Sequence, residues 1–306
     1  MTIPPIIHLL FFPGGLFMLA LALAYEYVDR KVVARFQNRI GPRWFQPAAD
    51  VLKLLIKEEV TPNVTHPVLF VALPVLALAG SLTAALSVPI LGLNPALSFP
   101  GDLIVTVYLL SLVTMSMGLA GWNTNNRFSL IGATRSLTQV FCYEAPFMLA
   151  LLGPAVVTGS WRITEILQTL DGQWIVFSQP IGFLVAVVGL MGKLEMPPFD
   201  APKAKTEIVA GAMTEYSGRG LGLFHLGKIV EEVVGLSLLA ALYLGGVSNP
   251  LAFFGKTLAL LVVMAACHCL FTRLRIDQTV GVWWRYGTVL VLLQWIAVIL
   301  WRVMTA

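Results

Sequence analysis

Residues 198–218 read PFDAPKAKTEIVAGAMTEYSG, a polar segment that lies between two long apolar runs. Hydrophobic residues make up 58% of the chain and charged residues only 12%. This segment nevertheless gathers, beside Tyr216, the charged residues Asp200, Lys203, Lys205, Glu207 and Glu215. Backbone groups at a membrane boundary must be hydrated or covered by protein. We interpret the segment as a docking and coupling face; the alternative is a solvated connector that joins two spans.

The composition indicates an integral membrane protein. The 306 residues have a mean hydropathy of +0.82, far above what the surface of a soluble domain tolerates. We predict an all-α integral membrane bundle, a single transmembrane domain over residues 1–306, with about eight helices that each cross a ~30 Å hydrocarbon core. The predicted spans are residues 5–25, 68–90, 103–121, 138–157, 175–191, 221–245, 256–271 and 282–303.

The first apolar run resembles a signal peptide, because residues 22–24 (Ala-Leu-Ala) are small like those of a cleavage site. However, no Lys or Arg precedes the run, and residues 29–31 (Asp-Arg-Lys) follow it as a stop-transfer signal. We therefore expect it to be retained as the first helix.

The cysteines argue against a metal or disulfide framework in this chain. There are three, Cys142, Cys267 and Cys269, and they form no CxxC pair. Too few thiolate and imidazole ligands are present for an iron–sulfur cluster or a zinc site. We predict no metal ligand, and we expect His268 to be a hydrogen-bonded core residue.

Residues 47–59 predict an amphipathic helix on the membrane surface. Pro47 suits the first helical position, and apolar positions such as Val51 and Leu55 then alternate at helical spacing with charged ones such as Asp50 and Lys53. A gating or docking role and a surface helix that only fills space remain alternatives.

The basic residues favour one orientation. All but four of the 20 Lys and Arg residues fall in or beside the segments that follow the first, third, fifth and seventh spans; the exceptions are Arg162, Lys228, Lys256 and Arg302. Positive residues accumulate on the cytoplasmic side of membranes. We therefore predict a multi-pass protein of the cell (inner or cytoplasmic) membrane whose cytoplasmic loops, residues 26–66, 122–137, 192–220 and 272–281, form a docking face. The net charge of +4 then follows from topology and does not indicate nucleic acid.

Ionisable residues within the apolar runs are candidates for a proton path. An unpaired charge at the bilayer centre costs ~2.5–3.5 kcal/mol on insertion scales. Glu144 begins the fourth run, and Glu231 and Glu232 lie in the sixth. Lys228, four residues before Glu232, and His225 are spaced to share one helix face with it; an internal ion pair without a function is the alternative.

A second group of charges lies on the predicted cytoplasmic segments: Arg135, Glu144, Asp200, Glu207 and Glu215. Acids and bases that converge under an apolar bundle suit a proton-loading cavity or a polar headgroup pocket. Ordinary ion pairs between surface loops are the alternative.

Short motifs follow one another in a fixed order on these segments. They are DRKVVAR (29–35), RIGP (39–42), QP (46–47), KLLIKE (53–58), GW (121–122), IGA (131–133) with Arg135 and Gln139, YE (143–144), PFD (198–200), EIVAG (207–211) and TEYSG (214–218). This set resembles the complex I subunit 1 family over most of the chain.

The resemblance implies the membrane subunit on which a peripheral redox arm docks. Such subunits occur in respiratory complex I, at the mouth of a quinone tunnel, and in related membrane-bound nickel–iron hydrogenases and sulfur-reducing complexes that couple ferredoxin oxidation to ion pumping. We predict no catalytic residue in this chain and no activity of the chain alone. The predicted coupling or proton-path residues are Glu144, Asp200, Glu207, Glu215, Lys228, Glu231 and Glu232. The predicted docking or headgroup-pocket residues are Asp29, Arg30, Arg35, Arg39, Arg135, Phe199 and Tyr216.

Departures from the family pattern favour the hydrogenase-related branch. Lys203, Lys205 and Lys228 stand where family members usually carry acids, which changes the local charge by about six units at neutral pH. The segment between residues 42 and 46 is shorter than in quinone-reducing members, and residues 273–278 (RLRIDQ) look like the hydrogenase-type branch.

The leading hypothesis is an anchor and coupling subunit of a complex I-related oxidoreductase of the ferredoxin-linked hydrogenase or sulfane-reductase type. Iron–sulfur clusters and a nickel–iron centre would belong to partner subunits, and a quinone is a further candidate ligand. The expected partners are peripheral iron–sulfur and hydrogenase-like subunits, antiporter-like membrane subunits and the lipid bilayer, but no nucleic acid. The alternatives are the quinone-binding subunit of respiratory complex I and a stand-alone secondary transporter built on Lys228 and Glu232. No internal repeat supports an inverted-repeat transporter.

Overall fold

The computed structural model describes residues 10–12, 14–63, 65–170 and 172–305, and over these residues it is all-helical, without a strand. The α-helices are α2 (Gly15–Phe36), α3 (Gln46–Ile56), α4 (Pro67–Leu86), α5 (Asp102–Asn123), α6 (Arg127–Thr158), α7 (Ile163–Leu170), α8 (Pro180–Leu194), α9 (Lys205–Ile208), α10 (Gly218–Tyr243), α11 (Pro250–Leu270), α12 (Ile276–Val282) and α13 (Thr288–Thr305). Shorter 3₁₀ turns are η1 (Ile175–Phe177), η2 (Ala201–Lys203) and η3 (Gly211–Met213), and η4 (Trp283–Gly287) is a π-helical turn.

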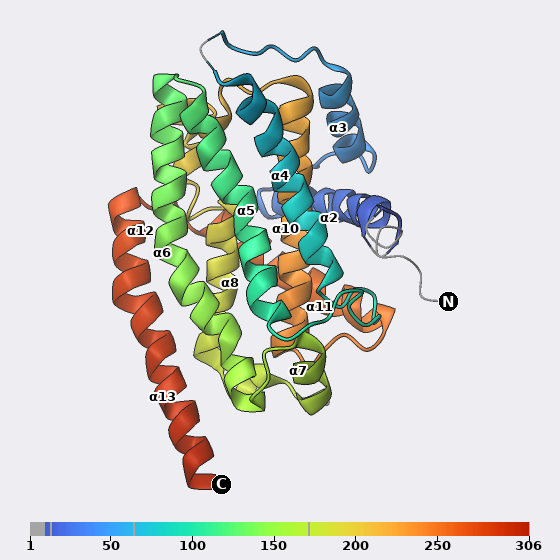
Figure 1. Ribbon diagram of the computed structural model, residues 1–306, viewed down its shortest axis with the longest axis vertical. Coiled ribbons are helices and arrows are strands. Elements are labelled where there is room, and N and C mark those ends of the chain that lie inside the picture. The colour runs from blue at the N-terminus through green and yellow to red at the C-terminus, as the bar shows by residue number, and fades with distance from the viewer. Residues whose placement is uncertain (1–9, 13, 64, 171, 306) are drawn as a thin grey trace.

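Helix α10 is the centre of the bundle. Every residue from 229 to 243 is buried, as expected for a helix that is surrounded by other helices on all sides. Helices α4, α5, α6 and α8 run beside it, α13 runs along the outside, and α2 with α3 occupies the opposite flank (Figure 1). Because α5 and α6 are antiparallel neighbours, the end of α5 and the start of α6 meet at one end of the bundle, and the start of α5 and the end of α6 meet at the other.

Five helical stretches are long and apolar enough to cross a membrane: Pro67–Leu86, Asp102–Asn123, Arg127–Thr158, Pro250–Leu270 and Ile276–Leu300. They correspond to five of the predicted spans. Helix α8 has only 15 residues, about 22 Å at ~1.5 Å per residue, and α2 and α10 carry several charges. The all-helical membrane fold is confirmed, whereas the count of eight spans stays a prediction.

Two helices extend beyond the predicted segment boundaries. The first span was predicted to end at Tyr25, and its residues 5–9 lie outside the described residues, but α2 continues to Phe36. A Glu26–Arg30 ion pair one turn apart supports this extension. The predicted loop 122–137 is mostly helical, because Asn126 accepts a hydrogen bond from the Phe128 N–H and so caps α6 at Arg127.

The C-terminal helical stretch is joined to the bundle through Trp283 in η4. Its side chain is buried, with 2% exposed. The centre of its ring lies 5.3 Å from that of Phe199 and 6.4 Å from that of Tyr143 on α6. The polar segment of residues 198–218 is thus packed, through Phe199, directly against the start of this C-terminal stretch.

Candidate functional site

The PFD segment is held by hydrogen bonds to its backbone carbonyls, one of them from a side chain of α6. The Gln139 side chain donates to the Phe199 carbonyl at 2.8 Å and to the Gly192 carbonyl at 3.0 Å. The Leu274 N–H donates to the Pro198 carbonyl at 2.9 Å. A single buried glutamine therefore joins the end of α8 to residues 198–218, the motif segment. The Leu274 backbone N–H holds the first residue of this segment by a further hydrogen bond.

Two glycines, Gly132 on α6 and Gly211 in the motif segment, allow the segment to pack closely against α6. A Cβ added to Gly132 on α6 would lie less than 3.0 Å from the backbone of Gly211 and Ala212. Gly211 itself has φ +59°, and a Cβ there would overlap the Pro202 carbonyl oxygen. Only glycine allows this close packing. The motif residues are consequently held in fixed positions above α6.

Ion pairs cover the surface of this segment. Arg135 pairs with Glu207 at 2.6 Å, and the Arg273 guanidinium donates two hydrogen bonds of 2.7 Å to Asp200. Hydrogen bonding to Arg135 lowers the pKa of Glu207. Three of these residues, Arg135, Glu207 and Arg273, line a cavity of about 450 Å³ together with residues 274–277. The predicted convergence of Arg135, Asp200 and Glu207 is thus seen in the structure.

The other predicted motif residues lie apart from this cavity. Glu215 accepts a hydrogen bond from Asn126 at the start of α6. Phe199 and Tyr216 are buried, with 2% and 3% exposed, and Tyr216 stacks on Phe70 at 4.2 Å between ring centres. Both aromatic residues were predicted as docking or headgroup-pocket residues; the structure places their rings in the core beneath the surface of the segment.

A second layer of polar groups lies under the surface pairs. Glu195, 5% exposed, accepts a hydrogen bond from Ser136 at 2.8 Å and pairs with Lys203 at 3.0 Å. Lys203 comes from the motif segment and Ser136 follows Arg135 on α6. This layer therefore connects the surface with the bundle interior.

The innermost polar cluster contains two lysines and two glutamates. Lys193, fully buried, pairs with Glu144 at 3.1 Å and donates to Ser111 at 2.7 Å; Ser111 in turn donates to Glu144. Lys228 donates to the Lys193 carbonyl at 2.8 Å and pairs with Glu231 at 3.2 Å. The cluster joins α5, α6, α8 and α10 at the core of the bundle.

The predicted alignment of His225, Lys228 and Glu232 is only partly observed. Lys228 pairs with Glu231 rather than with Glu232. His225 instead lies 2.9 Å from Glu26 on α2, whose other partner, Arg30, also binds Asp50 on α3 at 2.8 Å. Because adjacent residues on a helix face different directions, Glu232 does not share the Lys228–Glu231 pair.

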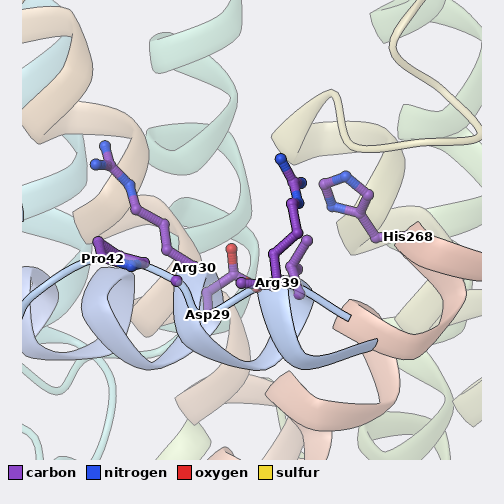
Figure 2. Close-up of a pocket in the computed structure, with 8 residues that line it drawn as sticks. Asp29, Arg30, Arg39, Pro42 and His268 are labelled. Carbon is purple, nitrogen blue, oxygen red and sulfur yellow. The ribbon is translucent and has the colours of Figure 1, made fainter. Parts of the chain in front are cut away.

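A cavity of about 380 Å³ lies where α2 ends beside α11, and its lining includes Asp29, Arg30, Arg39, Pro42 and His268. Figure 2 shows Arg30 and Arg39 on either side of Asp29, with the His268 ring next to Arg39. Among the described residues, His268 Nδ1 is buried without a hydrogen-bond partner. The expectation of a hydrogen-bonded core histidine was therefore wrong. Arg35, predicted with this group, is exposed on the same helix.

Within the described part of the chain, no group of three or more His, Cys, Asp or Glu side chains is arranged to hold a metal ion. The paired acids and bases can transfer protons and form hydrogen bonds with one another.

Sequence reasoning missed three residues of the polar network: Ser111, Lys193 and Glu195. We placed Lys193 among the cytoplasmic basic residues, yet its side chain is fully buried. The signal was present, since both Lys193 and Glu195 lie in the otherwise apolar run LMGKLEM at residues 190–196. A lysine and a glutamate in such a run require partners.

The family model described as NADH dehydrogenase matches residues 9–299. The H subunit of NADH-quinone oxidoreductase from Dehalococcoides mccartyi (strain CBDB1) is 32% identical over 302 residues, which cover 92% of this chain and 83% of the relative. The corresponding protein of Carboxydothermus hydrogenoformans is 33% identical over 286 residues, which cover 88% and 81%. Among solved structures, a chain of the membrane-bound sulfane sulfur reductase, an archaeal respiratory membrane complex, matches with a TM-score of 0.85 and 25% identity, over 92% of this chain and 96% of that chain.

Proposed function

This chain belongs to the NADH dehydrogenase family of membrane subunits found in oxidoreductase complexes, and from that premise we propose that it anchors and couples a complex I-related, ion-translocating oxidoreductase. We assign it to the ferredoxin-linked hydrogenase or sulfane-reductase type. The similarity to the sulfane sulfur reductase chain and the lysines at positions 203, 205 and 228 support this branch.

The observation that carries the proposal is a series of paired polar groups. The series runs from the motif surface, which is formed by Arg135, Asp200, Glu207 and Arg273, to the buried centre of α10. It starts at the Arg135–Glu207 pair, continues through Glu195 with its partners, and ends at the cluster of Lys193, Glu144, Lys228 and Glu231. Arg135 and Glu144 are nine residues apart on α6, about 13 Å along a helix axis. The series thus extends over about two and a half helical turns, from the surface to the interior.

The proposed coupling step uses these pairs as follows. A change of charge at a redox site seated on the motif surface alters the Arg135–Glu207 and Arg273–Asp200 pairs. Movement of Lys203 then changes the charge balance at Glu195. When a proton or a side-chain displacement reaches Glu144, the pairing of Glu144 with Lys193 becomes weaker. The Lys193 carbonyl accepts a hydrogen bond from the Lys228 ammonium, so Lys228 is affected next. The neighbouring antiporter-like subunits receive the signal from there.

The motif surface is proposed as the seat of the peripheral subunits that carry iron–sulfur clusters and the hydrogenase-like catalytic centre. Exposed Arg35, Arg39 and Lys205 add positive charge around the paired cluster. A complementary acidic surface on the partner would be steered to this face. Co-purifying subunits identified by mass spectrometry test this assignment: a hydrogenase-like large subunit supports it, and an NADH-binding subunit contradicts it.

Substitution of Glu144 or Glu207 by Gln in the assembled complex is expected to uncouple it. Each change keeps the side-chain volume but removes a charge from the network. We expect ion pumping to fall by at least about tenfold, equivalent to ~1.4 kcal/mol, while electron transfer falls less. Ion uptake into proteoliposomes and electron transfer are measured on the same preparation.

The control for these variants is Glu58→Gln, at an exposed position on the same predicted side, which should change neither rate. Full rates of electron transfer and of pumping in both Glu144→Gln and Glu207→Gln would contradict the coupling role.

A second candidate is quinone binding in the cavity beside Asp29. Relatives of this chain are named as subunits of NADH-quinone oxidoreductase, and Arg39 and His268 offer hydrogen-bond donors at the cavity wall. If this is the function, quinone-site inhibitors compete with electron transfer and Arg39→Met weakens them. Electron transfer that is insensitive to such inhibitors excludes this candidate.

A further inference from the structure

A cavity of about 510 Å³ lies at the end of the bundle opposite the motif segment. Its walls come from the start of α5, with Pro100, Gly101 and Ile104, and from the turn after α6, residues 159–162, with Glu165 on α7. This is the lower end in Figure 1, where α7 lies. None of these residues takes part in the polar network described above.

Basic residues lie in and beside the cavity wall, although they are rare at this end of the bundle. Only four of the 20 basic residues lie away from the motif segments; one of them, Arg162, lines the cavity, and a second, Arg302, lies close to the Gly159 part of its wall. Arg302 donates a hydrogen bond to the Val156 carbonyl at 2.8 Å. Its Nη2 also lies 3.6 Å from the position that a Cβ would take if one were added to Gly159, which lines the cavity. Two guanidinium groups beside one turn favour an anionic ligand.

Arg162 keeps hydrogen-bonding capacity unused. One of its terminal nitrogens pairs with Glu165 at 3.0 Å, whereas its Nε is buried and has no hydrogen-bond partner among the described residues. A guanidinium offers five N–H donors in a planar fork that matches a phosphate.

The surroundings are those of a membrane interface. Trp161, 46% exposed, lines the cavity, and tryptophan is enriched at the level of lipid headgroups. Ile104 in the wall and Tyr108, 58% exposed one turn further along α5, continue an apolar strip from the cavity along the outside of the helix. A ligand with a polar head in the cavity and an apolar tail along α5 fits this arrangement.

We propose that this cavity binds the headgroup of a zwitterionic phospholipid that carries a primary amine. The phosphate accepts hydrogen bonds from Arg162, with Arg302 adding positive charge, and the ammonium group lies against the Glu165 carboxylate. The size agrees with ligand sites of roughly 300–1,000 Å³. The Glu165 carboxylate disfavours a purely anionic lipid, since it would repel a second negative charge.

The test uses the full complex purified in detergent and depleted of lipid. Native mass spectrometry measures binding of phosphatidylethanolamine, phosphatidylcholine and phosphatidylglycerol, and of soluble glycerophosphoethanolamine. We expect phosphatidylethanolamine to bind most tightly, with at least about tenfold weaker binding in Arg162→Met. Glu165→Gln should remove the preference for phosphatidylethanolamine over phosphatidylcholine, whose quaternary amine cannot donate hydrogen bonds.

The control is Lys256→Met, which removes another of the four basic residues outside the motif segments and should leave lipid binding unchanged. Equal lipid affinities in Arg162→Met and the unaltered complex would overturn the proposal. Equal binding of phosphatidylglycerol would overturn the assignment of the amine to Glu165. Binding of glycerophosphoethanolamine as tight as that of the intact lipid would overturn the lipid as the ligand.

Discussion

Replacing Lys193 with Met is expected to destabilise the protein by about 3–5 kcal/mol, because it leaves the Glu144 carboxylate in the bundle without its cation. Lys193 is fully buried and lies 3.1 Å from Glu144. The loss should appear as a lower melting temperature of the purified complex in detergent, measured by intrinsic fluorescence or light scattering.

Two further variants separate charge from volume at this site. Adding Glu144→Gln to Lys193→Met removes the unpaired charge and should restore a large part of the lost stability. Lys205→Met, at an exposed position of the motif segment, should stay within about 0.5 kcal/mol of the unaltered protein. If Lys193→Met is as stable as Lys205→Met, the pairing of Lys193 with Glu144 contributes nothing to the folded state.

Gly211→Ala is expected to be the most damaging small substitution in the motif segment. A side chain at its positive φ costs about 1–2 kcal/mol, and the added Cβ would overlap the Pro202 carbonyl, which adds roughly 1–3 kcal/mol of overpacking. Because η3 would have to move away from Pro202 in η2, the surface pairs beside it should be displaced as well. We expect lower thermal stability together with loss of peripheral subunits during size-exclusion chromatography.

The matched control is Gly172→Ala. Gly172 also has a positive φ, +76°, but nothing lies within 4 Å of its Cβ position, so only the conformational cost applies. Retention of the peripheral subunits by Gly211→Ala at the same level as by Gly172→Ala would show that close packing at η3 does not shape the docking surface.

Hydropathy and loop charge were sufficient to predict an all-helical membrane bundle, since long apolar runs leave few other folds in a bilayer. They predicted boundaries less well. The charged residues after Tyr25 suggested a loop, but an ion pair within the helix and a hydrogen bond from Arg30 to Asp50 on α3 allow α2 to continue. Local composition does not show whether a charged residue faces water or a partner on another helix.

The same limit applies to the polar network. Glu144, Glu207 and Asp200 were predicted from their cost in an apolar chain and from the family motifs. Their partners Lys193 and Arg273 come from segments far away in the sequence, and no spacing rule connects them. The helical spacing that suggested a Lys228–Glu232 pair was equally compatible with Lys228 and Glu231, and only the packing of α10 against α8 decided between them.

The position of Trp283 has a mechanical consequence for the whole subunit. Its ring is wedged between Phe199, next to Asp200, and Tyr143, next to Glu144. If an adjoining membrane protein displaced the last helix, we expect the Trp283 ring to move with it and to shift Phe199 and Tyr143. The neighbouring carboxylates, Asp200 and Glu144, would then change position together. The outer wall of the bundle is therefore linked, through one aromatic side chain, to both segments that carry these acids.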